Sequence, residues 1–189
     1  MTGLEIVTAC VAACELADCN KFEGHLAVEI LKQALADEGI AASARDVFIK
    51  GVPVEWDLLV PRVEAAPLFN GLLYEPAQAN VAIEVKLSGL CGSKAKALST
   101  IRGNFKLAQA AGVQCVYVAF CESQSGCATD ENLGFPCFNL TWSHKPKPRE
   151  DSGDWPRLLR FLRGAACEYI GPSARKERGP QDDRALVRG

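Results

Sequence analysis

The stretch Val81-Ala-Ile-Glu-Val-Lys-Leu-Ser-Gly89 decides how this chain is interpreted. It has the composition of a buried strand, yet it carries two charged residues, Glu84 and Lys86. Because side chains alternate along a strand, Glu84 and Lys86 point to one face while Val85 points to the other. An acid and a base in an apolar strand are costly to desolvate unless they have partners or a chemical role.

A second acidic residue lies upstream in a similar setting. The segment Val54-Glu-Trp-Asp-Leu-Leu-Val60 places Asp57 among strand-forming apolar residues. Two carboxylates and one ammonium at neighbouring strand ends would form a site for a divalent metal ion and a phosphate. The alternative is a solvated strand edge with a surface ion pair that contributes little to stability.

The order of these residues resembles the PD-(D/E)XK nuclease superfamily, the fold of many restriction endonucleases, Holliday-junction resolvases and RecB-like nucleases. In that family a helix with a Glu is followed by a strand with an Asp, a strand with Glu-x-Lys, and then a helix and another strand. Residues 21 to 120 present the same series, and the family's Pro-Asp is replaced here by Trp56-Asp57. The matching residues are Glu23, Asp57, Glu84 and Lys86.

The resemblance implies a metal-dependent endonuclease that hydrolyses phosphodiester bonds in DNA, with Mg²⁺ as cofactor and Mn²⁺ as its substitute. Asp57, Glu84 and the backbone carbonyl of Val85 would hold the metal, and Glu23 would contribute directly or through a water. Lys86 would orient or help deprotonate the attacking water and offset charge on the phosphorane. We expect these residues to be needed for cleavage but not for folding, so Ala at Asp57 or Glu84 should keep or raise the melting temperature.

Two other classes of function stay open. A catalytically silent member of the same fold could serve nucleic-acid binding or protein assembly, and the net charge of −2 favours it. The nine cysteines suggest a redox- or zinc-responsive protein, although no Cys-x-x-Cys pair is present. The residues themselves do not distinguish DNA from RNA, or endonuclease from exonuclease action.

The helix expected over residues 21 to 38 offers two acids for the site. Glu23 lies within the arc of its apolar stripe, which includes Leu26 and Ile30, whereas Glu29 lies on the opposite side. We therefore expect Glu23 to reach the metal site and Glu29 to face solvent. The alternative for Glu23 is a carboxylate that stabilises the first turn through the helix dipole.

Periodicity and turn residues predict an α/β fold, a three-layer α/β/α sandwich with a mixed central sheet, and this pattern fits more than one three-layer fold. The resemblance implies the restriction endonuclease-like type. The strand over 113–120 is apolar enough for the middle of the sheet, and Pro136 suggests an edge position for the strand over 135–142. Residues 1–20 are expected to hold an N-terminal helix, 21–170 the nuclease-like domain and 171–189 a disordered tail. Strands are predicted at 45–52, 54–60, 72–74, 80–87, 113–120 and 135–142, and helices at 3–17, 21–38, 93–111 and 155–166.

Nucleic-acid binding would need a local basic surface, because the chain as a whole is slightly acidic. Lys94 and Lys96 at the start of the helix after Gly89, and Arg102 within it, are the candidates for phosphate contacts. The last predicted helix carries a basic stripe of Arg157, Arg160 and Arg163, for which a solvated face is the default reading. The sequence has no apolar run long enough to span a membrane, so we expect an intracellular, cytoplasmic protein. A homodimer is one of the oligomeric states that the sequence leaves open.

Overall fold

A computed structural model of the chain describes residues 2, 5, 8, 9, 12, 20–86, 95–121, 128–143, 149–150 and 153–167. Within these ranges the side chains of residues 20–23, 95–96, 121, 141–143, 149–150 and 166–167 are not described. The helix expected over residues 3–17 and the tail over 171–189 fall outside the described residues, apart from isolated positions in the former.

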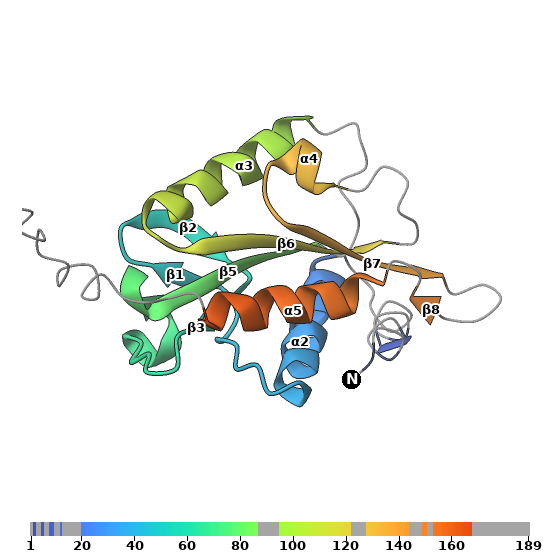
Figure 1. The fold of residues 1–189 in the computed structure, drawn as a ribbon, viewed down its shortest axis with the longest axis horizontal. Helices are drawn as coiled ribbons and strands as arrows, with labels where there is room; N and C mark the ends of the chain where they lie inside the picture. The colour runs from blue at the N-terminus through green and yellow to red at the C-terminus, as the bar shows by residue number, and fades with distance from the viewer. Residues whose placement is uncertain are drawn as a thin grey trace, which may run out of the picture.

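Figure 1 shows the described helices and strands. They are α2 Asn20–Asp37, β1 Val47–Ile49, β2 Val52–Trp56, β3 Leu58–Pro61, η1 Phe69–Gly71, β4 Leu73–Tyr74, η2 Pro76–Gln78, β5 Ala79–Lys86, α3 Ala95–Ala110, β6 Gln114–Cys121, α4 Asp130–Leu133, β7 Cys137–Ser143, β8 Arg149–Glu150 and α5 Asp154–Cys167. Three strands follow α2 in succession, and from β5 to β7 strands and helices alternate.

The strands form a main sheet in the order β3-β5-β6-β7-β8 and a small sheet in the order β2-β1-β4. In the main sheet β5, β6 and β7 are parallel, whereas β3 and β8 run antiparallel to their neighbours. The sheet is therefore mixed, as the sequence predicts. The apolar strand β6 lies in its middle, which confirms the position expected for residues 113–120.

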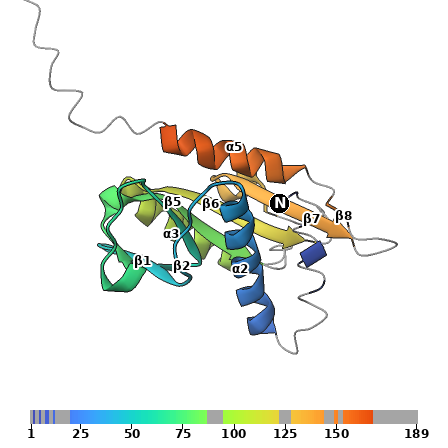
Figure 2. The same cartoon turned by 90° about the horizontal axis from the view of Figure 1, so that it is seen from below.

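Helices cover both faces of the main sheet. Figure 1 shows α3 and α4 above the sheet and α2 and α5 below it, and Figure 2 shows α2 and α5 on that lower face, running in different directions. Each face has its own buried cluster: Leu31 of α2 and Leu158 of α5 pack with Ile83, and Phe105 of α3 packs with Ala82. This arrangement confirms the predicted three-layer α/β/α sandwich.

The alternation of β5 assigns its charged residues to one layer. Val81, Ile83 and Val85 belong to the cluster under α2 and α5. Ala82 belongs to the cluster under α3, so Glu84 and Lys86, two and four positions further on, point to the α3 side.

The segment predicted as one strand over 54–60 is two strands with a bend at Asp57. β2 pairs with β1 in the small sheet and β3 pairs with β5 in the main sheet, so the chain changes sheets at this residue. The strand predicted over 45–52 is likewise shorter, because Gly51 at φ +80° turns the chain from β1 into β2.

The outer edge of β3 is covered by the segment that follows α2. The N–H of Ser43 donates to the carbonyl of Leu59, and the N–H of Leu59 donates to the Ser43 hydroxyl, both at 2.8 Å. Ser43 is buried, so these bonds are shielded from water. They hold the strand that begins one residue after Asp57.

Two further expectations need correction. The strand over 135–142 is not at the sheet edge, because β7 begins after Pro136 and pairs with β6 on one side and with β8 at Trp142 and Ser143 on the other. The region 121–134, expected to be a loop, contains the short helix α4, which Thr129 caps by accepting from the N–H of Asn132. Among the described residues no helix is long and apolar enough to cross a membrane.

Candidate active site

Asp57, Glu84 and Lys86 meet at the carboxyl end of β5. The Lys86 Nζ lies 2.5 Å from Glu84 Oε1 and 3.6 Å from Asp57 Oδ2. The same ammonium donates to the backbone carbonyl of Val85 at 3.1 Å. The structure thus brings together the four groups that the sequence motif pointed to on these two strands.

Strand pairing explains this convergence. Leu58 is the antiparallel partner of Ile83, so Asp57, one residue earlier on its strand, comes beside Glu84, one residue later on its own. Regular pairing ends at this point because the chain bends at Asp57. Beyond the last regular pair, it is the Asp57 side chain that accepts a hydrogen bond from β5.

The backbone of β5 makes use of that side chain. The N–H of Val85 donates to Asp57 Oδ2 at 2.7 Å, a short, charge-assisted hydrogen bond. Asp57 therefore orients its carboxylate against the main chain of β5 as well as toward Lys86. The same bond satisfies a backbone donor that strand pairing leaves without a partner.

The site is largely shielded from water on its acidic side. The Glu84 side chain is 16% exposed and the Asp57 side chain 27% exposed. Burial raises the pKa of Glu84 above its ordinary value. The positive charge and hydrogen bond of Lys86 oppose this rise, and the negative charge of Asp57 adds to it.

The pKa of Lys86 is raised even though the side chain is partly buried. Desolvation alone would lower the pKa of Lys86, but the charges of Glu84 and Asp57 and the hydrogen bonds to them outweigh it, so the pKa is raised. The ammonium therefore keeps its proton throughout the neutral range. In this state Lys86 is a donor and a positive charge, not a proton acceptor.

The oxygen groups at this site fit a hard divalent cation. Two carboxylates from Asp57 and Glu84 and the carbonyl of Val85 are the ligand types that Mg²⁺ and Mn²⁺ take in proteins. No group of three or more His, Cys, Asp or Glu side chains suited to a metal ion occurs among the described residues. A third carboxylate would have to come from a side chain outside that set, such as Glu23.

Of the two candidate acids of α2, the structure describes the side chain of Glu29 and not that of Glu23. Glu23 lies in the first turn of α2, a helix on the opposite face of the sheet from Glu84, and its side chain is outside the described set, so its role stays a prediction. Glu29 is exposed and pairs with Arg45, its Oε1 lying 3.3 Å from the Arg45 Nε. Glu29 is thus engaged by Arg45 of the following segment.

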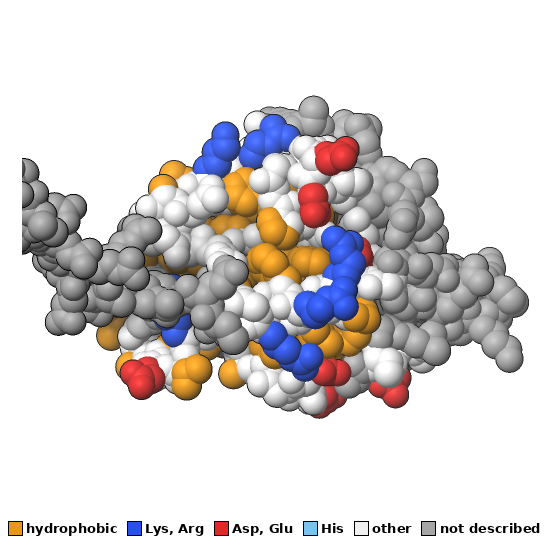
Figure 3. Space-filling model, in the orientation of Figure 1, with side chains coloured by type: hydrophobic (Ala, Val, Ile, Leu, Met, Phe, Trp, Pro, Cys, Tyr) orange, Lys and Arg blue, Asp and Glu red, His pale blue; other side chains and the backbone are white. Residues whose placement is uncertain are grey.

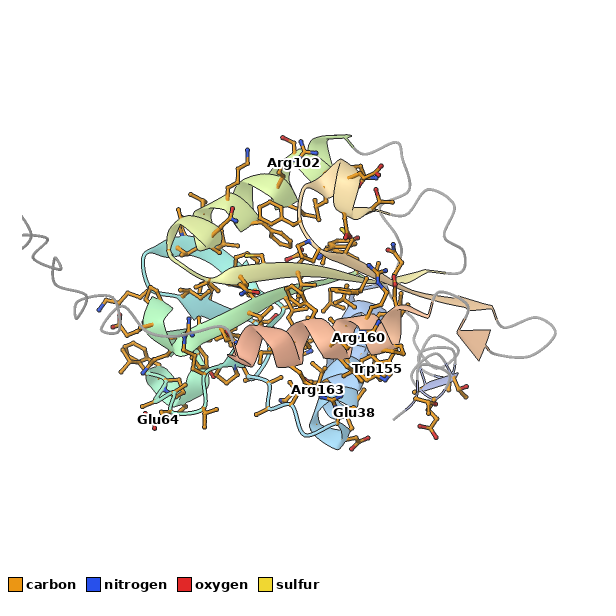
Figure 4. The ribbon with its side chains drawn as sticks, in the orientation of Figure 1. Glu38, Glu64, Arg102, Trp155, Arg160 and Arg163 are labelled. Atoms are coloured by element: carbon orange, nitrogen blue, oxygen red, sulfur yellow. The ribbon has the colours of Figure 1, made fainter. Side chains whose placement is uncertain are left out.

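Of the three residues predicted to contact nucleic acid, the structure describes the side chain of Arg102 alone. Lys94 and the side chain of Lys96 lie outside the described residues. Arg102, labelled in Figure 4, uses its guanidinium to bind the carbonyls of Asn132 and Leu133 at the end of α4. Arg102 therefore links α3 to α4 by hydrogen bonds. A phosphate could bind Arg102 only by sharing its guanidinium with these carbonyls.

The basic stripe of α5 lies in a different layer from the site. Figure 3 shows Lys and Arg side chains gathered along the face where α5 is in front, and Arg157, Arg160 and Arg163 are exposed. Arg157 pairs with Asp154 in its own helix. Arg163 pairs with Glu38 at 2.8 Å, and Figure 4 labels these two residues. Because α5 covers the other face of the sheet from Glu84, the stripe lies in a different layer from the Glu84 and Lys86 side chains.

The face that bears Glu84 and Lys86 continues across the sheet in a way that the sequence did not suggest. Tyr117 of β6 is the register partner of Glu84, and Ala119 is the partner of Lys86. One strand further on, Ala119 pairs with Asn139, a buried residue whose side-chain amide donates to the carbonyl of Ala128. The apolar strand pattern concealed these polar groups, because Tyr117 reads as a core aromatic residue.

Two of the nine cysteines have described side chains. Cys115 and Cys137 are buried free thiols, and burial raises the pKa of each to about 12. Neither thiol would ionise readily for metal binding or redox chemistry. The redox- or zinc-responsive alternative therefore rests on cysteines outside this set.

Comparison with known proteins places the fold. No family model matches the chain, and no curated protein sequence matches it. Among solved structures, NucC of P. aeruginosa ATCC27853 in its cAAA-bound form superposes with a TM-score of 0.62 at 9% identity, over 86% of this chain and 88% of that one. The chain has the fold of NucC.

Two structures of E. coli MS115-1 NucC extend the likeness, each at 12% identity. The cAAA-bound form gives a TM-score of 0.62 over 86% of this chain and 87% of that one. The apo form gives 0.51 over 85% and 87%. The likeness confirms the restriction endonuclease-like fold expected from the sequence, and at this identity it concerns the fold alone.

Proposed function

We propose that the protein is a Mg²⁺-dependent nuclease that hydrolyses phosphodiester bonds in DNA as an endonuclease. The observation that carries this proposal is the convergence of Asp57, Glu84 and Lys86 at one strand end within a restriction endonuclease-like fold. An acid pair and a lysine from two strands match the Asp and Glu-x-Lys order of the PD-(D/E)XK superfamily. DNA is the substrate because the resemblance is to enzymes of restriction and recombination.

Asp57, Glu84 and the Val85 carbonyl would hold Mg²⁺, or Mn²⁺ in its place, with Glu23 as a further ligand directly or through a water. When bound, the ion would polarise the scissile phosphate and lower the pKa of a coordinated water. The bond from the Val85 N–H to Asp57 Oδ2 keeps one carboxylate oxygen occupied and fixes the direction of the other. The Asp57 carboxylate is thus preorganised by the backbone of β5.

Lys86 would act as the cation of the site. Its raised pKa keeps the side chain protonated, so it can donate to a phosphate oxygen or orient a water, and it offsets negative charge that develops on the phosphorane. Of the two roles predicted for Lys86, the orienting role has this support, and the deprotonating role would require the pKa to fall. Lys94, Lys96 and Arg102 would contribute contacts to the DNA backbone.

A catalytically silent protein that binds nucleic acid or assembles with other proteins is the second candidate. It is favoured by the net charge of −2. The ion pairs that engage Arg157 and Arg163 of the α5 stripe leave less positive charge for a phosphate backbone and so favour its protein-assembly form. It would bind without cutting.

A plasmid-nicking assay tests the proposal. Wild type should convert supercoiled DNA to nicked or linear product with Mg²⁺ or Mn²⁺ and not with EDTA, and it should leave single-stranded RNA intact. Because two NucC structures hold cAAA, the assay is run with and without cAAA.

Glu84→Gln should lower the nicking rate at least about hundredfold, because it removes a proposed metal ligand. Glu75→Gln is the matched control, because Glu75 pairs with Lys50 at 2.6 Å on the small sheet, away from the site, and it should cut like wild type. Binding of plasmid without cleavage under every metal and cAAA condition would instead favour the silent protein.

A further inference from the structure

The Lys86 ammonium contacts each of the three groups that the proposed function assigns to the metal. Its Nζ lies 2.5 Å from Glu84 Oε1, 3.1 Å from the Val85 carbonyl oxygen and 3.6 Å from Asp57 Oδ2. A lysine ammonium has three N–H donors and no acceptor. The ammonium is therefore directed at the same three oxygen groups, within hydrogen-bond range of Glu84 and the Val85 carbonyl and at a longer ion-pair distance from Asp57.

We propose that Lys86 is a built-in competitor for the metal, so that a divalent ion can bind only by displacing its ammonium from Asp57, Glu84 and the Val85 carbonyl. This inference rests on the proposed function, because it concerns the same oxygen groups. A divalent ion coordinated by the same carboxylates and carbonyl would lie close enough to the ammonium for strong repulsion in a half-buried site. Metal binding and the Lys86 contacts therefore oppose one another.

Competition explains how the carboxylates coexist in the absence of an ion. Glu84 is 16% exposed and Asp57 27%, so two uncompensated acids here would repel one another strongly. Lys86 comes from the same strand as Glu84 and is held in place by that strand, so it neutralises the pair without any external cation. The fold can then form before metal arrives.

Displacement would also release Lys86 for a second task. Once the ammonium leaves the acids, its donors are free for a phosphate oxygen of the substrate. Metal and DNA would therefore favour each other's binding, and this linkage is reciprocal. The metal affinity of the free protein would be weak, because part of the binding free energy is used to break the Lys86 contacts.

Calorimetric titration of the full-length protein with Mn²⁺ alone, without DNA, tests this proposal. Lys86→Met keeps the length and apolar stem of the side chain but removes the competing charge, and it should lower the Mn²⁺ dissociation constant at least about tenfold. Lys50→Met is the matched control, because it removes one positive charge from a lysine that pairs with Glu75 outside the site. It should change the constant by less than about twofold.

An unchanged or larger dissociation constant for Lys86→Met would overturn the proposal. If Lys86→Met fails to fold without metal, Lys86→Gln serves as a second variant with the same expected sign, and the rise in melting temperature on adding Mn²⁺ should exceed that of wild type. Adding Glu84→Gln to Lys86→Met separates the two claims. Binding that persists unchanged in this double variant would place the metal elsewhere and overturn the proposed metal site together with the competition.

Discussion

The carboxylate of Asp57 accepts a hydrogen bond of 2.7 Å from the backbone N–H of Val85, across the point where the chain leaves the small sheet for the main one. Asp57 thus completes the hydrogen bonding of β5 in addition to facing Lys86. This revises the expectation that Ala at Asp57 would keep or raise the melting temperature. Removing this side chain relieves acid–acid repulsion but also leaves a backbone donor without its partner.

Asn and Ala at Asp57 should therefore differ in stability. Asp57→Asn retains an oxygen that can accept from Val85, whereas Asp57→Ala does not and should lower the free energy of unfolding by about 1–3 kcal/mol. The lower end of that range is expected, because Asp57 is 27% exposed and water can partly replace it. Urea unfolding compares the two variants, and both should fail to nick plasmid. Equal stability of the two would mean that the Val85 bond contributes nothing measurable.

Lys86→Arg should lose most of the nicking activity even though it keeps the positive charge. Arg presents a wide planar fork, which cannot direct its donors at three convergent oxygens as the compact ammonium does. The variant should remain folded and should still bind Mn²⁺, as titration can check. Wild-type activity in this variant would reduce Lys86 to general charge balance.

The pH dependence of stability should reveal Glu84. Its pKa is raised on folding, so the folded chain holds this proton more tightly than the unfolded chain. The group's stabilising contribution is complete below the unfolded value and is lost as pH rises through the raised folded value. Unfolding is measured without metal from pH 4 to 7. As pH rises over this range, the unfolding free energy of wild type should fall relative to that of Glu84→Gln. A shift in the opposite direction would mean that Lys86 lowers the pKa of Glu84 more than burial raises it.

The helix acids give a paired test. Glu23→Gln should weaken Mn²⁺ binding or turnover, because Glu23 is the predicted helix member of the site. Glu29→Gln should change neither, because Glu29 is exposed and pairs with Arg45 at 3.3 Å. The two substitutions remove the same charge from the same helix, so a loss confined to Glu29→Gln would show that the helix register was assigned wrongly.

Much of the fold could be predicted because burial within the sheet dominates the order of apolar and polar residues in its central strands. The long strand β5 alternates cleanly up to Glu84 and Lys86, and the apolar β6 can only lie inside a sheet. The bend at Asp57 could not be predicted, because Leu58 and Trp56 are equally good strand formers and the change of sheet is decided by tertiary pairing. Pro136 was misleading for a similar reason, because it precedes β7 instead of lying within it.

The candidate site was predictable where it depends on residues close in sequence. Glu84 and Lys86 lie two positions apart on one strand, so strand alternation alone places them together. The bond from Val85 to Asp57 joins residues 28 positions apart and depends on the β3–β5 register, which no local pattern encodes. The same holds for Tyr117 and Asn139, which reach this face only through strand pairing.

Anomalous diffraction from crystals grown with Mn²⁺ would show whether Asp57 and Glu84 hold the catalytic metal ion. We expect an anomalous peak within about 2.0–2.4 Å of carboxylate oxygens from both residues, with the Lys86 Nζ moved away from them. No peak at this position, with Lys86 still seated between Glu84 and Asp57 at a saturating Mn²⁺ concentration, would contradict this assignment.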